Sequence, residues 1–243
     1  MEKIEYYLLY LLISIIFLLF SCQDNLFLVQ EEIKMKNKTL TIRKAQEIFE
    51  QTISSEANIR GKADTIKPGL FPGDFTPVWG KAKESADSFI ESVDMPIIAR
   101  FSYRRAFKDS IKNGKYLWGR ISVYQKLLIV FDKRNQTTGC FIISLIPTKE
   151  YYKNHKNDVA ERFLNCGLKN DFSGIVLYST LKDNRMVRVN VVKDGQTIKA
   201  ASVFNRKNTS LENFKLMQSL IGDGKFYRID NDNDPRKKIH IYY

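Results

Sequence analysis

The sequence predicts an α+β domain in which an antiparallel sheet of about five or six strands carries helices packed mainly on one face. The 243 residues are 44% hydrophobic, enough for one substantial core, and they include 16 Phe and 12 Tyr against 12 Gly and 6 Pro. Amphipathic helical patterns stand near both ends of the chain. Between them, strand patterns follow one another across short turns, which is typical of an antiparallel sheet.

An apolar run followed by a cysteine opens the chain. Residues 6–20 are apolar apart from a single serine, a length typical of an export signal and short for a bilayer span. The next stretch, LFSC at 19–22, resembles the bacterial lipobox, in which a small residue precedes a cysteine that receives lipid. We therefore expect residues 1–21 to be a lipoprotein signal peptide and Cys22 to be the lipidated first residue of the mature protein.

Two features depart from an ordinary lipoprotein signal and leave an uncleaved membrane helix or a buried core helix open. The segment before the apolar run has one Lys against two Glu, and Lys34, Lys36 and Lys38 follow the run, an order that would keep the downstream side of an uncleaved anchor in the cytoplasm. The small residue and the cysteine at the end of the run favour the lipid anchor. Because Gln23 rather than Asp follows the cysteine, we expect a cell-envelope protein held by lipid, at the outer membrane.

Residues 22–38 are predicted to be a tether and residues 39–222 the α+β domain. Apolar residues at helical spacing predict an amphipathic helix over 41–55. Prolines and glycines then interrupt regular structure as far as Thr76-Pro77, a cap-and-first-turn pair that predicts a short helix through Ala86.

From residue 89 the apolar period changes to two, and strands alternate with turns. Strands are predicted over 89–106, 116–131, 140–147, 172–180, 186–192 and 197–204, with a hairpin turn at 133–139, another at 193–196, and helices over 158–165 and 210–221. Residues 223–243 are predicted to be a C-terminal tail with an edge strand at 238–242.

The chain is strongly basic. Its 39 Lys and Arg against 27 Asp and Glu give a net charge of +12, which attracts nucleic acid, anionic lipid or acidic polysaccharide. The basic residues are dispersed from Arg43 to Lys238, which is more typical of a solvated surface than of a binding stripe. No specific nucleic-acid binding is therefore predicted, and binding to polyanions in general stays open.

No catalytic residue is predicted. After the signal segment the chain has two histidines, His155 and His240, and two cysteines, Cys140 and Cys166, and none has the local sequence of a Cys–His hydrolase. In an oxidising envelope Cys140 and Cys166 would be able to form a disulfide. Otherwise they are small buried hydrophobic residues, and both alternatives are open.

No metal site and no cofactor are predicted either. The segment DNDND at 230–234 offers oxygen ligands suited to Ca²⁺, but Pro235 and Ile241 stand where an EF-hand needs Gly and Glu, so we expect a polar turn. Aromatic residues are candidate platforms for a sugar ring, although core packing is their commoner role; these are Trp79, Trp118, Tyr151 and Tyr152.

Four stretches together resemble a family of uncharacterised envelope lipoproteins of anaerobic gut bacteria. They are PGDFTPVWGKA (72–82), VDMPI (93–97), YQKLLIV with FIISLIP (124–147) and DFSGIVLYS (171–179). The resemblance spans residues 40–205 and implies an envelope lipoprotein with a mixed sheet domain, without any implied activity or catalytic residue.

The predicted function is a lipid-anchored, non-enzymatic interaction or binding module for a protein partner or an envelope polymer such as a polysaccharide. The evidence is an anchor joined to a domain without catalytic motifs. The alternative is an envelope hydrolase that acts on glycan or peptide through carboxylates that the sequence does not single out.

Overall fold

The computed structural model of the protein describes residues 40–56, 70–112, 115–166, 171–205, 207–230 and 240–241; the side chains of 55–56, 109–112, 115–118, 230 and 240–241 lie outside this description. The elements in these ranges are α2 (Ile42–Glu56), η1 (Pro72–Asp74), β1 (Phe75–Pro77), η2 (Trp79–Lys81), β2 (Lys83–Ala86), β3 (Ile90–Ala99), β4 (Phe101–Lys112), β5 (Lys115–Asp132), β6 (Thr137–Pro147), α3 (Lys149–His155), α4 (Val159–Arg162), β7 (Gly174–Thr180), β8 (Met186–Lys193), β9 (Gln196–Ser202), α5 (Ser210–Ile221), β10 (Lys225–Asp230) and β11 (His240–Ile241).

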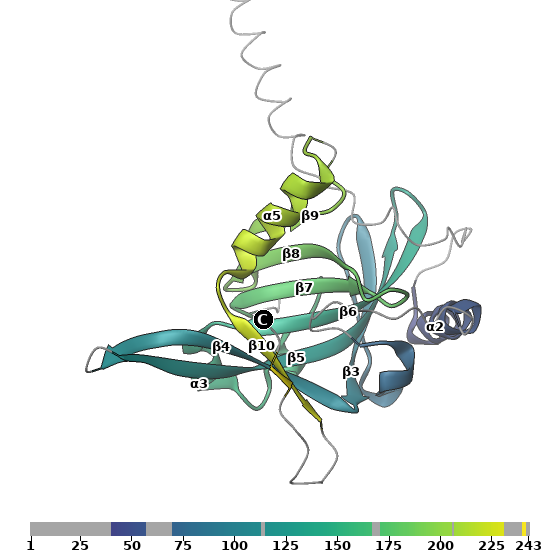
Figure 1. The fold of residues 1–243 in the computed structure, drawn as a ribbon. Coiled ribbons are helices and arrows are strands. Elements are labelled where there is room, and N and C mark those ends of the chain that lie inside the picture. Colours follow the sequence, from purple (N-terminus) through teal and green to yellow (C-terminus); the bar gives the residue numbers. More distant parts are fainter. Residues whose placement is uncertain are drawn as a thin grey trace, which may run out of the picture.

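All eleven described strands belong to one antiparallel sheet (Figure 1). Strands β5 to β9 pair with one another in chain order. Strand β5 is 18 residues long and changes partner along its length: its first part pairs with β4, and its second part lies between β3 and β6. Strands β1 and β2 extend the sheet beyond β3, and β10 and β11 extend it beyond β4.

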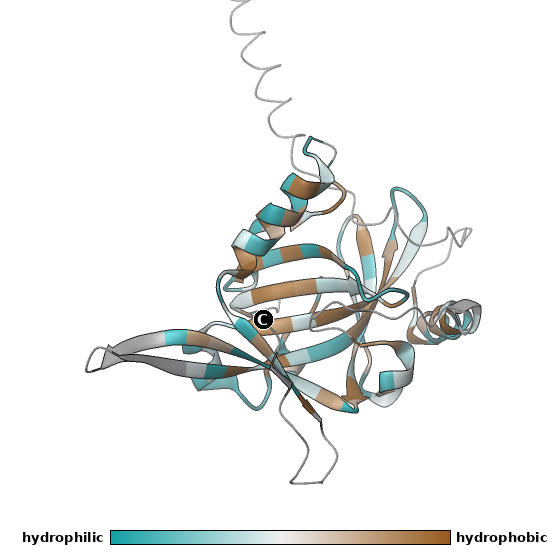
Figure 2. Ribbon diagram, in the orientation of Figure 1, coloured by the Kyte–Doolittle hydropathy of each residue, from teal (hydrophilic) through white to brown (hydrophobic). Residues whose placement is uncertain are grey.

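The central strands are covered on both faces. Along β5, Leu127 and Ile129 belong to one hydrophobic core and the intervening Leu128 to a second, because successive side chains of a strand point to opposite faces. Figure 2 shows hydrophobic residues running along β7, in agreement with a strand that is covered from both sides. Continuous apolar runs such as LLIVF are expected in such strands.

Different helices cover the two faces. The α2/α5 core includes Ala45, Ile48 and Phe49 of α2 and Met217 of α5. The α3/α4 core is covered by the segment between β6 and β7. This segment contributes Tyr151 of α3, Val159 of α4, Phe163 and Phe172. Burying an aliphatic or aromatic side chain of this size stabilises a fold by about 1.5 to 3 kcal/mol, so both layers contribute substantially.

The predicted fold class is wrong. The described chain is mostly antiparallel sheet, with eleven strands rather than five or six, and its helices cover both faces rather than mainly one. Residues 76–86 form β1, η2 and β2 instead of a helix, because their backbone pairs along β3. The predicted strand over 89–106 is divided into β3 and β4 at Arg100.

Several local predictions are confirmed by the structure. Helix α2 occupies almost the predicted range, and α5 occupies it fully. In the turn between β8 and β9, Asp194 and Gly195 have φ of 48° and 77°, as a two-residue hairpin turn requires. The tail differs from its prediction, because it adds β10, an unpredicted strand that pairs with β4; β11, which pairs with β10, lies within the predicted edge strand at 238–242.

Candidate ligand-binding cleft

A cleft of about 640 Å³ lies where the ends of β6, β7 and β8 meet α3. Its apolar lining comes from the sheet, and its polar lining comes from β4, from α3 and its cap, from the residue before β7, and from the end of β8 with the turn after it. The apolar residues are Ile146, Pro147, Gly174, Ile175, Val191, Val192 and Ile198, and the polar ones are Arg105, Thr148, Glu150, Tyr151, Asn154, His155, Ser173, Lys193 and Asp194. A concave, mainly apolar surface with a few polar groups is the usual form of a ligand site.

Close backbone packing fixes the strand ends that form the cleft. A Cβ added to Gly174 would lie 2.3 Å from the carbonyl oxygen of Ile146, so only glycine allows β7 to begin here. Ser173 accepts a hydrogen bond from the Asp194 backbone N–H at 2.8 Å and donates to the Asp194 carboxylate at 3.2 Å. Helix α3 begins beside them, because the Thr148 side chain caps it by accepting from the Tyr151 N–H.

Three polar side chains on the cleft form no hydrogen bond or ion pair with any described residue: Glu150, Asn154 and Lys193. They provide an acceptor, an amide and a cation that a ligand would be able to engage. Since Glu150 and Lys193 have opposite charges, the rim has no single sign of potential.

Arg105 forms a rigid part of the cleft wall. Its Nη2 donates to the Ile221 carbonyl at the end of α5, and its Nε is buried without a hydrogen-bond partner. Burial lowers the pKa of this guanidinium, and the charge of Asp223 counters that effect. A Cβ on Gly224 would lie 1.9 Å from the Arg105 Nε, so a larger residue at 224 would force the Arg105 side chain to move.

A chain of polar contacts joins α3 to α4 behind the cleft. Tyr151 donates to Asp171 at 3.0 Å, and Arg162 donates to Asp171 at 2.8 Å and to Asp158 at 2.6 Å. The His155 ring lies 4.5 Å from the Tyr151 ring. Burial raises the pKa of the Tyr151 hydroxyl, and its hydrogen bond to Asp171 raises it further. These side chains form their hydrogen bonds and ring contacts with one another, which indicates a structural role.

Under the α4 segment lies a buried ion pair. Lys126 of β5 is 2% exposed and donates to Asp94 of β3, which is fully buried, and also to the Phe163 carbonyl at 2.8 Å. Burial raises the pKa of Asp94 and lowers that of Lys126, and each partner's charge acts in the opposite direction. The second oxygen of Asp94 has no hydrogen-bond partner. The pair does not line the cleft, so it does not meet a ligand there.

The two cysteines lie on opposite faces of the sheet, and both are free in the structure. Cys140 belongs to the α2/α5 core and contacts the Thr52 hydroxyl at 3.7 Å. Cys166 accepts from Ser92 at 3.5 Å on the other face. Burial raises the pKa of the Cys166 thiol, so it is a poor nucleophile, and no disulfide joins the pair.

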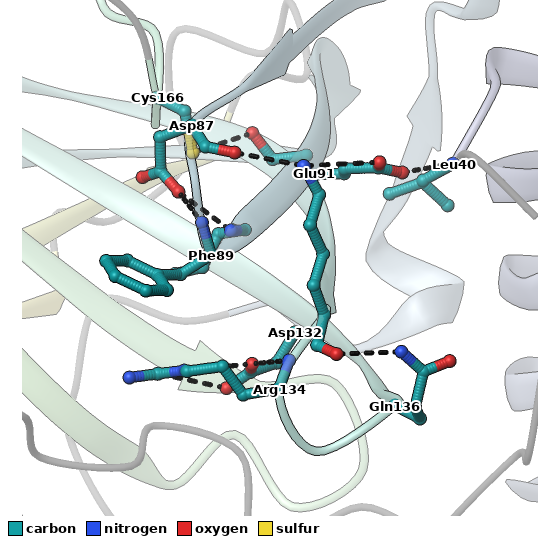
Figure 3. Close-up of polar contacts among 11 residues, drawn as sticks. Leu40, Asp87, Phe89, Glu91, Asp132, Arg134, Gln136 and Cys166 are labelled. Atoms are coloured by element: carbon teal, nitrogen blue, oxygen red, sulfur yellow. Dashed lines mark hydrogen bonds and ion pairs between the residues drawn. The ribbon is translucent and has the colours of Figure 1, made fainter. Parts of the chain in front are cut away.

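A carboxylate binds the first described residue of the domain, where the predicted tether would join it (Figure 3). The Leu40 backbone N–H donates to Glu91 at 2.5 Å, and Lys133 pairs with the same carboxylate at 3.5 Å. In the adjoining turn, Asp132 accepts from the Arg134 guanidinium at 3.1 Å. The first residue of the described domain is thus held against β3, whatever precedes it.

The remaining predicted residues do not form a site together. Trp79 packs against Phe49 of α2, with ring centroids 5.9 Å apart, and Tyr151 is buried, so neither offers an open platform for a sugar. Tyr152 is half-buried outside the cleft lining, and the side chain of Trp118 is outside the described part. Cys22, residues 1–39 and nearly all of the DNDND segment also lie outside the described residues.

Within the described ranges, no group of three or more His, Cys, Asp and Glu side chains is arranged to hold a metal ion. Among the helices that the structure describes, none has the length and apolar character needed to cross a membrane.

The chain was compared with models of known protein families, with curated proteins and with solved structures, and none of the three comparisons found a match. The resemblance to envelope lipoproteins therefore stays a prediction based on four sequence stretches.

Sequence reasoning missed the cleft, because its lining comes from six elements that are spread along the chain between Arg105 and Ile198: β4, β6, α3, β7, β8 and β9. One local signal was present. Pro147-Thr148 directly follows an apolar strand, and a threonine in this position is a common first cap of a helix. It would have indicated α3, which forms one wall of the cleft.

Proposed function

We propose that this protein is a lipid-anchored, non-enzymatic binding protein of the cell envelope, and that its cleft holds a short segment of a partner polypeptide. The supporting observation is the form of the cleft: an aliphatic floor from β6 to β9 below a rim that carries both an acid, Glu150, and a base, Lys193.

A polypeptide fits this lining better than a polysaccharide does. Sugar rings are usually bound on the open face of an aromatic side chain. Tyr151 is the one aromatic ring besides His155 among the described lining residues, and it is 7% exposed and packed at a tilt against the His155 ring. Aliphatic side chains such as Ile175 and Val191 instead suit the apolar side chains of a peptide, and the rim suits its amide groups and charges.

A binding role also agrees with the chemistry of the described residues. The Cys166 thiol is buried and protonated, and the carboxylates of Asp158 and Asp171 are bridged by Arg162. General acid–base catalysis needs a group free to transfer a proton to a bound substrate. Glu150 is the one carboxylate on the described cleft lining that is not already hydrogen-bonded, so the lining offers no pair of free acids.

Site-specific photocrosslinking in the membrane-bound full chain tests the proposal. A photoreactive phenylalanine analogue at Asn154 lies on the cleft, and the same group at Leu211 lies on the exposed outer side of α5, which is the matched control. We expect a discrete protein adduct from position 154 and none from position 211. The adduct should disappear when Val191→Lys is added, because a charge would then stand on the apolar floor.

Two results would contradict the proposal. One is an adduct pattern that is the same at positions 154 and 211, or the absence of any protein adduct at 154. The other is turnover of a peptide or glycan substrate by the purified protein that Val191→Lys abolishes.

A further inference from the structure

A single arginine brings positive charge to the apolar side of the cleft. Arg105 stands on β4 two residues after Tyr103, and residues two apart on a strand share a face of the sheet. Tyr103 and Ile146 belong to the α2/α5 core, and Ile175 packs against that core. Arg105, Ile146 and Ile175 all line the cleft. The guanidinium therefore lies on the same face of the sheet as this part of the aliphatic floor.

Arg105 forms no ion pair with a carboxylate of the described residues. The charge of Asp223 acts on it, but Asp223 is exposed to solvent, which screens that charge. The one hydrogen bond of the guanidinium within the described part of the chain goes to the Ile221 carbonyl, and its Nε is buried without a partner. Because a guanidinium has five N–H donors, most of them have no acceptor among the described residues.

The end of α5 offsets this charge only in part. The last carbonyls of an α-helix together carry about half of a negative elementary charge. The bond to the Ile221 carbonyl fixes the position of the guanidinium, while burial still disfavours its charged form and lowers the pKa of Arg105. A partly buried cation without a matching anion destabilises the free protein. An anionic group of a ligand would remove that cost.

The charges of the whole lining favour a single negative charge over a polyanion. Apart from His155, the lining has two bases, Arg105 and Lys193, against two acids, Glu150 and Asp194. A ligand with many negative charges would be repelled by both acids. A single carboxylate beside an apolar side chain suits one guanidinium next to an aliphatic floor.

We propose that Arg105 binds a carboxylate of the partner segment, beside an apolar side chain of that segment on the floor formed by Ile146 and Ile175. This inference rests on the proposed function, in which the cleft holds a segment of a partner polypeptide. An arginine and a carboxylate form charge-assisted hydrogen bonds, which are stronger than bonds between neutral groups. The carboxylate is either the C-terminus of the partner or the side chain of an Asp or Glu, since both present the same two oxygens.

Peptide binding to the full chain in detergent tests this inference before any partner is known. The probes are three sets of acetylated octapeptides with apolar residues at alternate positions: one with a free C-terminal carboxylate, one amidated, and one amidated with a single internal Glu. We expect one carboxylate-bearing set to bind about 10- to 100-fold more tightly than the amidated set, as a hydrogen bond to a charged group provides. Preference for the first set identifies a chain terminus, and preference for the third identifies an acidic side chain.

Arg105→Gln and Arg104→Gln form a matched pair of variants. Arg104 is exposed and precedes Arg105 on β4, so its side chain points to the opposite face and its replacement removes the same charge away from the floor. Arg105→Gln should abolish the preference for carboxylate-bearing peptides, and Arg104→Gln should leave it unchanged. Arg105→Lys keeps the charge but lacks the planar fork of the guanidinium, so it should retain only part of the preference.

Equal binding of all three peptide sets by the original protein would overturn the inference, and this comparison does not depend on the folding of any variant. Failure to bind any carboxylate-bearing peptide would overturn it as well. So would a preference that survives Arg105→Gln in a variant whose circular dichroism is unchanged, because another group would then bind the carboxylate. The proposed function is tested separately by the protein adduct from position 154, so its failure is distinguishable from the failure of this inference.

Discussion

Replacing Lys126 by Met is the sharpest test of the energetics of this fold. The substitution keeps most of the side-chain volume and leaves Asp94, which is fully buried, without its cation. Removing one member of a buried pair costs about 3 to 5 kcal/mol, because the remaining charge stays desolvated. With a urea dependence of about 2 to 3 kcal/mol per molar, the unfolding midpoint should fall by about 1 to 2.5 M at pH 7.

The loss should depend on pH with a definite sign. Burial already raises the pKa of Asp94 above its ordinary value of 3.8, and Lys126 is the first of the groups that counter this effect, so its removal raises the pKa further. The folded variant then holds its proton more tightly than the unfolded chain does. Its deficit is therefore small below pH 3.8 and grows as the pH rises, by up to about 1.4 kcal/mol per pH unit, until the pKa of the folded state is passed.

Urea unfolding followed by tryptophan fluorescence at a series of pH values measures this deficit. The control is Asp94→Asn/Lys126→Met, which removes both charges and should lie within about 1 to 2 kcal/mol of the original protein. If the double variant were as unstable as Lys126→Met, or if the deficit did not change with pH, the cause would be lost packing or the lost bond to the Phe163 carbonyl rather than an unpaired charge.

Three further predictions concern caps, glycines and thiols. Thr209→Ala should lower the free energy of unfolding by about 1 kcal/mol, measured by urea unfolding, because Thr209 accepts from the Glu212 N–H at the start of α5; no change would show that the cap is dispensable. Gly174→Ala should cost at least about 2 kcal/mol in the same assay, since its Cβ would meet the Ile146 backbone, whereas Gly73→Ala, with nothing within 4 Å of its Cβ, should change stability by less than about 0.5 kcal/mol. In a chain that begins at residue 39, a thiol reagent should react slowly with the native protein and should count two thiols in urea without reductant; fewer than two would reveal a disulfide that the structure lacks.

The central strands could be predicted from the sequence, but their surroundings could not. The run LLIVF identifies β5 because both faces are apolar. The same run contains no information on which helices cover which face. Lys126, directly before this run, was the visible sign that the face opposite α2 also closes over a buried pair, because a lysine inside a strand of this kind needs a partner.

The short strands and the cleft could not be predicted from local sequence patterns. Strand β2 has the sequence KESA, which shows no apolar alternation and forms only because its backbone completes β3. The pairing of β10 with β4 was hidden for a similar reason. Arg104 and Lys225 are separated by more than one hundred residues, and only the register of β10 against β4 makes them neighbours. The positions of basic residues along the sequence therefore do not show which of them lie close together in the folded protein.

The pairing of β10 with β4 also limits how early during synthesis the sheet can finish folding. Ala106 must wait for Lys225, and at about 5 to 20 residues per second the ribosome needs about 6 to 24 s to make the intervening segment. During that interval one edge of β4 has no neighbour, so the nascent chain cannot reach its final form before synthesis is nearly finished.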